Sequence, residues 1–176
     1  MDNTTLTTTD HAAHIRQTLK AQHGWNSRQV SVRADYYSMG SSIHVTIKDA
    51  SIPSSLVRAI AERAERIDRD GFGEILSGCN RYVDVGYDGP ALKALGSRWL
   101  GAIDAAYLEL HTAGENSLIP IQGTPYLLGY DGHRGWGFSL WQDGHQWNYY
   151  DLACVAEGLG VKMVNAITAD AKGGVQ

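Results

Sequence analysis

A repeated tripeptide, Asp-Gly-His at residues 131–133 and again at 143–145, has the residue types and spacing closest to those of a chemical site. If the two turns converged, an aspartate and a histidine from each would supply the four ligands of a Zn²⁺ ion. Asp-Gly between alternating runs also predicts tight hairpin turns, however. Successive turns of a meander lie at opposite ends of its strands, about 20 Å apart for six residues. We therefore expect two turns here and no metal site.

Other chemical patterns in the chain are weaker. The sequence contains no Gly-x-Ser-x-Gly elbow, no phosphate loop and no dinucleotide fingerprint. His11 and His14 share a helix face but have no identifiable third ligand. For nucleophilic catalysis, Cys79 with a distant histidine is the only arrangement to consider. We expect no enzyme activity and no cofactor, and a hydrolase that uses Cys79 or a His/Asp pair remains an alternative.

The composition limits the kinds of partner. The chain has 176 residues, of which 43% are hydrophobic, and its net charge is -4 from 19 acidic and 15 basic residues. This balance disfavours both a basic surface that grips nucleic acid and an acidic mimic of DNA. Cys79 and Cys154 lack Cys-x-x-Cys spacing and are expected to be free thiols. No signal peptide and no run of 18 apolar residues is present, so we expect a cytoplasmic protein.

Hydrophobic periodicity in the first half predicts an αββαβ unit over residues 10–88. Thr9 or Asp10 caps the first helix and Gly24 ends it, and alternating residues in 29–48 predict a β-hairpin. The second helix is expected to run to Ile67 with a Glu62–Arg66 ion pair. Residues 81–87 then form a third strand.

The second half, residues 89–168, predicts a different arrangement. A long central helix over 91–113 precedes a Trp-rich antiparallel β-meander, with strands at 125–130, 135–141 and 146–150. A short helix over 152–157 follows, ended by Gly158 and Gly160. We expect an α+β protein whose two halves pack as one globular unit.

Aromatic crowding is the strongest functional signal, because Tyr and Trp on an uncovered face are typical of protein-binding surfaces. One helix covers only one face of a meander, which leaves its other face available. A second contact is expected at the tip of the hairpin. The expected protein-binding residues are Tyr36, Tyr37, Met39, Trp136, Trp141 and Trp147.

Residues 10–88 resemble a large polyvalent protein-associated domain, number 29 in that series, found in mosaic proteins of phages, plasmids and integrative elements. The resemblance rests on His14-Ile15-Arg16-x-x-Leu19-Lys20, on Val30-Ser31-Val32-Arg33 and on Gly40-Ser41-Ser42-Ile43-His44-Val45. Ile47 stands where the family typically has an aromatic residue. The resemblance implies a mobile-element protein in a bacterial host cell, and it supplies no catalytic residues.

Together these observations predict a non-enzymatic protein that binds and modulates a host or competitor protein, for example by inhibiting a restriction or CRISPR effector. Self-association as a homodimer remains open. The alternative is a nucleic-acid-binding accessory module, since the αββαβ order is similar to that of a type II KH domain, although the Gly-x-x-Gly loop is missing. Its candidate contacts are Arg33, Arg58, Arg63 and Arg66.

Overall fold

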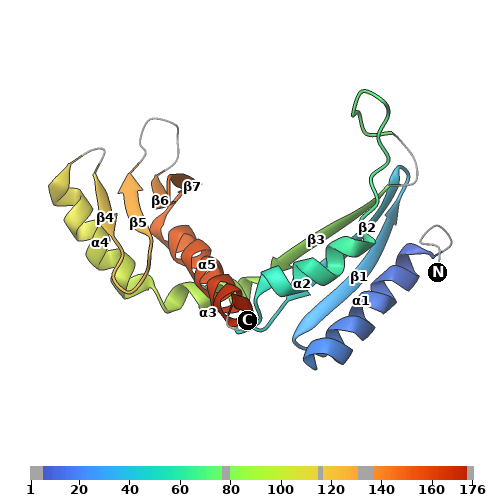
Figure 1. The fold of residues 1–176 in the computed structure, drawn as a ribbon. Coiled ribbons are helices and arrows are strands. Elements are labelled where there is room, and N and C mark those ends of the chain that lie inside the picture. Colours follow the sequence, from blue (N-terminus) through green and yellow to red (C-terminus); the bar gives the residue numbers. More distant parts are fainter. Residues whose placement is uncertain (1–5, 77–79, 115–116, 131–136, 174–176) are drawn as a thin grey trace. The chain divides into compact units, whose positions relative to one another are not determined.

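The computed structural model describes residues 6–76, 80–114, 117–130 and 137–173, with side chains described up to residue 167 (Figure 1). The protein belongs to the α+β class, and the chain divides into two compact units, Met1–Ala91 and Leu92–Gln176. Among the described residues, no helix is both long and apolar enough to cross a membrane.

The first unit is a three-stranded sheet with two helices packed on it. Its strands follow the order β1-β2-β3, with β1 antiparallel and β3 parallel to β2. Period-2 alternation places Val32, Val45 and Val85 in one buried row beneath the helices. Figure 1 shows these elements: α1 (Thr8–His23), β1 (Val30–Tyr37), β2 (Gly40–Ile47), α2 (Ser54–Ala61) and β3 (Arg81–Tyr87).

Helix α1 is capped at both ends by local sequence. Thr7 is the N-cap and forms a reciprocal capping box with Asp10, so the cap lies two residues before the expected Thr9. Gly24 adopts a left-handed conformation, with φ of 73°, and ends the helix as expected.

Helix α2 is shorter than the sequence predicts. It ends at Ala61, and a 3₁₀ turn over Glu62–Ala64 is followed by extended backbone at Glu65. Arg66 therefore leaves the helix, pairs across an isolated bridge with Arg81, and its guanidinium lies 3.1 Å from Asp68. The expected Glu62–Arg66 pair is wrong, because Glu62 bonds Arg58 at 3.3 Å instead.

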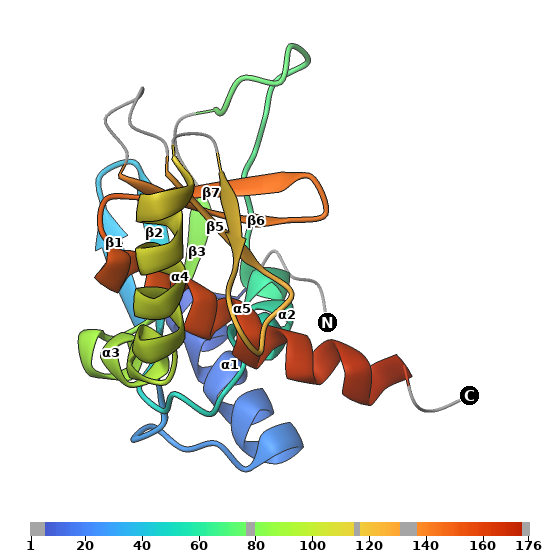
Figure 2. The same cartoon turned by 90° about the vertical axis from the view of Figure 1, so that its left-hand side faces the viewer.

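The second unit packs a four-stranded antiparallel sheet against helices α4 and α5 (Figure 2). The sequence predicted only three strands here. The first strand of the sheet was missed because its three residues are too few to show the alternation of apolar and polar side chains. Leu128, Leu140 and Trp147 form one cross-strand row. Their face of the sheet packs against the hydrophobic core of the second unit, which we call the second core. The strands are β4 (Leu118–Pro120), β5 (Leu127–Tyr130), β6 (Phe138–Gln142) and β7 (His145–Tyr149).

The expected long central helix is two helices, α3 (Gly89–Ser97) and α4 (Leu100–Ala113). The break follows Gly96 and Ser97, two residues of lower helix propensity than alanine. Between the helices Trp99 turns away from ideal helical geometry, with φ of -113°, and packs against the second core. Leu95 on α3 and Ile103 on α4 are nevertheless both fully buried.

The last helix, α5 (Leu152–Gly173), is far longer than the predicted 152–157. Gly158 and Gly160 do not end it, because both are places where another part of the chain approaches α5 closely. A Cβ on Gly160 would stand 2.7 Å from the carbonyl carbon and oxygen of Leu95, and a Cβ on Gly158 would overlap the Tyr149 ring. These glycines serve helix packing, and the interpretation of them as helix terminators is wrong.

Candidate functional site

The largest concentration of exposed apolar side chains lies at one end of the first unit. We call this set the distal patch. It holds six of the thirteen large apolar and aromatic side chains that are exposed among the described residues. Single exposed hydrophobic side chains are common on protein surfaces. Several of them close together indicate an interaction surface. The distal patch comprises Tyr36, Tyr37, Met39, Phe72, Ile75 and Leu76.

Half of the distal patch is the tip of the β1–β2 hairpin. Tyr36 and Met39 are each 62% exposed and Tyr37 is 47% exposed. Alternation along β1 sends the two tyrosines to opposite faces. The Tyr36 hydroxyl contacts Thr9 at the start of α1, and the Tyr37 hydroxyl donates to the carbonyl of Ser41. Both rings are therefore held in place while one side of each stays in water.

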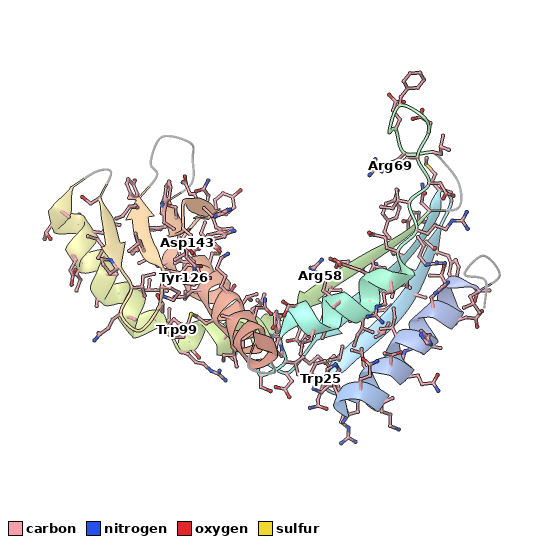
Figure 3. All side chains as sticks on the ribbon, in the orientation of Figure 1. Trp25, Arg58, Arg69, Trp99, Tyr126 and Asp143 are labelled. Atoms are coloured by element: carbon pink, nitrogen blue, oxygen red, sulfur yellow. The ribbon has the colours of Figure 1, made fainter. Side chains whose placement is uncertain are left out.

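The other half of the distal patch lies on residues 66–76, which we call the arm. The arm projects beyond the ends of the strands in both Figure 1 and Figure 2. Its turn is organised by Asp70, whose carboxylate accepts hydrogen bonds from the backbone N–H groups of Phe72 and Glu74. Arg69, labelled in Figure 3, donates to the carbonyl of Gly73. Phe72 is 97% exposed on this turn, so the structure presents an aromatic ring without covering it.

Asn80 ties the base of the arm to the sheet. Its side chain accepts from the N–H of Asp68 at 2.8 Å and donates to the carbonyl of Leu76 at 2.6 Å. Its own backbone carbonyl accepts from the N–H of Ser41, at the start of β2. Asn80 is buried, with 3% of its surface exposed. The arm and the hairpin tip are thus joined through one residue.

Replacing Asn80 with alanine is expected to loosen the arm. The Asp68 N–H and the Leu76 carbonyl would lose their partners, at a cost of about 1 kcal/mol for each of these part-buried hydrogen bonds. Hydrogen exchange followed by NMR measures this directly, and the Asp68 amide should exchange faster while the amides of β1 keep their protection. An unchanged rate at Asp68 would show that Asn80 does not hold the arm.

In the second unit the expected aromatic residues fall on different faces. Trp141 lies on the sheet face opposite Leu140, where its indole N–H donates to the buried Ser139 hydroxyl at 2.8 Å. Trp147 lies on the covered face, packed against the second core, with the Lys162 ammonium 3.2 Å from its ring centroid. Trp136 and residues 131–133 of the repeated tripeptide lie outside the described residues. Of Trp141 and Trp147, Trp141 is therefore the better placed for contact.

The four arginines of the nucleic-acid hypothesis do not gather on one surface. Arg33 lies on the open face of the first sheet, opposite the helices, because it alternates with the buried Val32. Arg58, labelled in Figure 3, bonds Glu62 and the Val85 carbonyl, and Arg66 is paired with Asp68. Arg63 lines a small cavity between the helices. Two of the four charges are therefore neutralised locally.

A polar network on the open face of the first sheet was not foreseen. The Ser42 hydroxyl lies 2.9 Å from His44 Nε2, and His44 Nδ1 lies 3.8 Å from the Asp84 carboxylate. This is the order of groups in a Ser–His–Asp triad. However, Asp35 also approaches Nε2, at 3.5 Å, and the Asp84 side chain is 78% exposed. The Asp84 carboxylate is therefore mostly in solvent, and the parallel register of β2 with β3 brings it beside His44.

Across the part of the chain that the structure describes, no three His, Cys, Asp or Glu side chains converge as metal ligands. Cys154 is a half-buried free thiol, and burial raises its pKa. No family model, curated protein or solved structure matches the chain. The candidate site therefore stands on geometry alone.

Proposed function

We propose that this chain is a non-enzymatic protein-binding module that docks through the distal patch. The observation that carries the proposal is Phe72, almost fully exposed on a turn that Asp70 and Asn80 hold in shape. Exposing an aromatic ring loses the favourable free energy of its burial, about 1.5–3 kcal/mol for a Phe side chain. Burial of that ring against a partner recovers it.

The chemistry of the distal patch fits a protein partner better than nucleic acid. Its members include two tyrosines and a phenylalanine, and aromatic residues and Met are enriched at protein interfaces. The arm carries three acidic residues, Asp68, Asp70 and Glu74, against two arginines, and Arg66 is already paired with Asp68, so the arm has no basic excess to attract a phosphate backbone. An apolar groove on a protein surface is the complementary shape for a projecting ring.

The host-directed part of the proposal rests on the resemblance of residues 10–88 to a module of mobile elements. We propose that the partner is a protein of the bacterial host or of a competing element, with a restriction or CRISPR effector as the target class. In such a setting, binding by itself inhibits the target when it covers a working surface. No catalytic group of this chain is required.

The proposal is tested by affinity capture from a bacterial lysate, with purified candidate effectors as a second arm. The chain is expected to retain a defined protein in both arms, and nuclease treatment is expected to leave the captured protein unchanged. Capture that disappears after nuclease treatment, together with salt-sensitive binding of the purified chain to nucleic acid, would contradict the proposal and favour the alternative function.

A further inference from the structure

A cavity of about 280 Å³ lies in the first unit where α1 meets α2 and the 3₁₀ turn, and no residue of the distal patch lines it. It is open to solvent on one side. Its walls combine aliphatic side chains with histidine and arginine, which is the composition of a small-molecule site that has a few polar groups for orientation. The residues that line it are Leu6, His11, His14, Ile15, Thr18, Ile60, Arg63 and Ala64.

His11 is the unusual member of this wall. Only 4% of its surface is exposed, and its Nε2 atom is buried without a hydrogen-bond partner. Buried polar atoms are almost always hydrogen-bonded, and each exception calls for a physical explanation. His11 lines the cavity, and a rotation of its ring that turns Nε2 toward the cavity would let a ligand supply the missing partner.

Positive charge surrounds His11. Arg81 is 93% buried, donates through Nε to the carbonyl of the lining residue Ala64, and has a second nitrogen, Nη2, with no partner. Among the described residues no carboxylate pairs with Arg81, although buried charges are ordinarily paired. Arg63 lines the cavity directly, and its guanidinium has no ion pair within the described part of the chain. The site thus has cationic groups that lack counter-charges.

We propose that this cavity binds a small organic anion. A carboxylate or phosphate group is held by His11 Nε2 and the Arg63 guanidinium, with the charge of Arg81 behind them. A compact apolar body lies against Leu6, Ile15 and Ile60. Charge-assisted hydrogen bonds supply the orientation, and the aliphatic wall supplies burial. The lining of this site contains no residue of the distal patch, although Arg81 lies in one cross-strand row with Ser41 and Tyr36.

The test uses the full chain labelled for NMR and four compounds: benzoate, phenyl phosphate, inorganic phosphate and neutral benzamide. Benzoate or phenyl phosphate is expected to give saturable shifts at the amides of Thr18 and Ala64 and at His11 Nε2. Benzamide, which has the ring without the charge, is expected to bind at least tenfold more weakly. Comparing the affinity for benzoate with the affinity for phenyl phosphate shows whether the site prefers a carboxylate or a phosphate monoester.

Two variants localise the binding. Arg63→Gln, at an exposed position, is expected to weaken the organic anion at least tenfold, and His11→Leu is expected to abolish the shifts. Arg33→Gln is the matched control, because it removes the same charge from the opposite sheet face. Shifts that are absent with every anion, or that Arg63→Gln leaves unchanged, would overturn the proposal. Equal affinity for benzamide, or for inorganic phosphate alone, would overturn the assignment of an organic anion.

The same histidine predicts how stability depends on pH. Burial lowers the pKa of His11, and the charges of Arg81 and His14 lower it further, while Asp10 opposes them. Below about pH 6.5 the unfolded chain takes up a proton that folded His11 does not. Stability is therefore fully present above that pH and falls as the pH drops toward the lowered pKa, by up to about tenfold in the unfolding equilibrium constant per pH unit.

Urea unfolding between about pH 5 and 8 gives the free energy of unfolding of the wild type and of His11→Leu. The difference between the two pH profiles is the contribution of His11, since the other groups titrate in both chains. The wild type is expected to lose more stability than the variant as the pH falls below about 6.5. Parallel curves for the two chains would mean that His11 accepts its proton equally well folded and unfolded.

Discussion

Phe72→Ser is expected to weaken binding of the captured partner by about 30-fold or more while leaving the stability of the chain unchanged. The ring is 97% exposed, so the folded state loses no packing when it is removed, and exposed substitutions usually change stability by less than about 0.5 kcal/mol. An aromatic anchor at the centre of an interface contributes about 2 kcal/mol or more on truncation. That free energy corresponds to the stated factor in Kd.

Calorimetric titration of the partner with wild type and variant measures the Kd, and thermal unfolding measures stability. Ile167→Ser is the matched control, since Ile167 is 67% exposed on α5 and lies outside the distal patch. Phe72→Leu is expected to keep part of the affinity, because an apolar side chain remains on the turn. A partner that binds Phe72→Ser as tightly as the wild type would remove the arm from the proposed interface.

Gly160→Ala is expected to destabilise the second unit by about 1–3 kcal/mol, the usual cost of overpacking a fitted contact. The new Cβ would stand 2.7 Å from backbone atoms of Leu95, and backbone cannot rotate away as a flexible side chain can. Helices α3 and α5 would have to separate locally. If Gly160 only ended a helix, alanine would extend the helix at no such cost.

Urea unfolding, read from tryptophan fluorescence, checks this expectation. Gly101→Ala is the control of opposite sign, because a Cβ at Gly101 in α4 meets no atom within 4 Å. It should stabilise the chain by about 0.4–1 kcal/mol through reduced entropy of the unfolded chain. Equal stability of Gly160→Ala and wild type would show that α3 and α5 do not approach closely.

Local signals in the sequence predicted most elements of the first unit. Alternating β-branched residues specify the β1–β2 hairpin, and Gly24 ends α1 because its left-handed conformation suits glycine. The exposed hairpin tip was also anticipated as a contact surface. Phe72 was not predicted to be a contact residue, because a single aromatic residue between two glycines shows neither hydrophobic periodicity nor a motif spacing. Only the bonds of Asp70 and Asn80 reveal the turn as an ordered arm.

The sequence by itself determined the class of the protein, the end of α1 at Gly24, and the alternation that buries one face of the β1–β2 hairpin. The tertiary structure decided what depends on contacts between distant residues. It brought the charge of Arg81 close enough to His11 to lower the pKa of that histidine. It also aligned His44 with Asp84 across two parallel strands, and it made Gly158 and Gly160 sites of close packing inside a helix. The physical reason is that caps and periodicity act within a few residues, whereas the register of a parallel strand and the approach of two helices are set by burial across the whole unit.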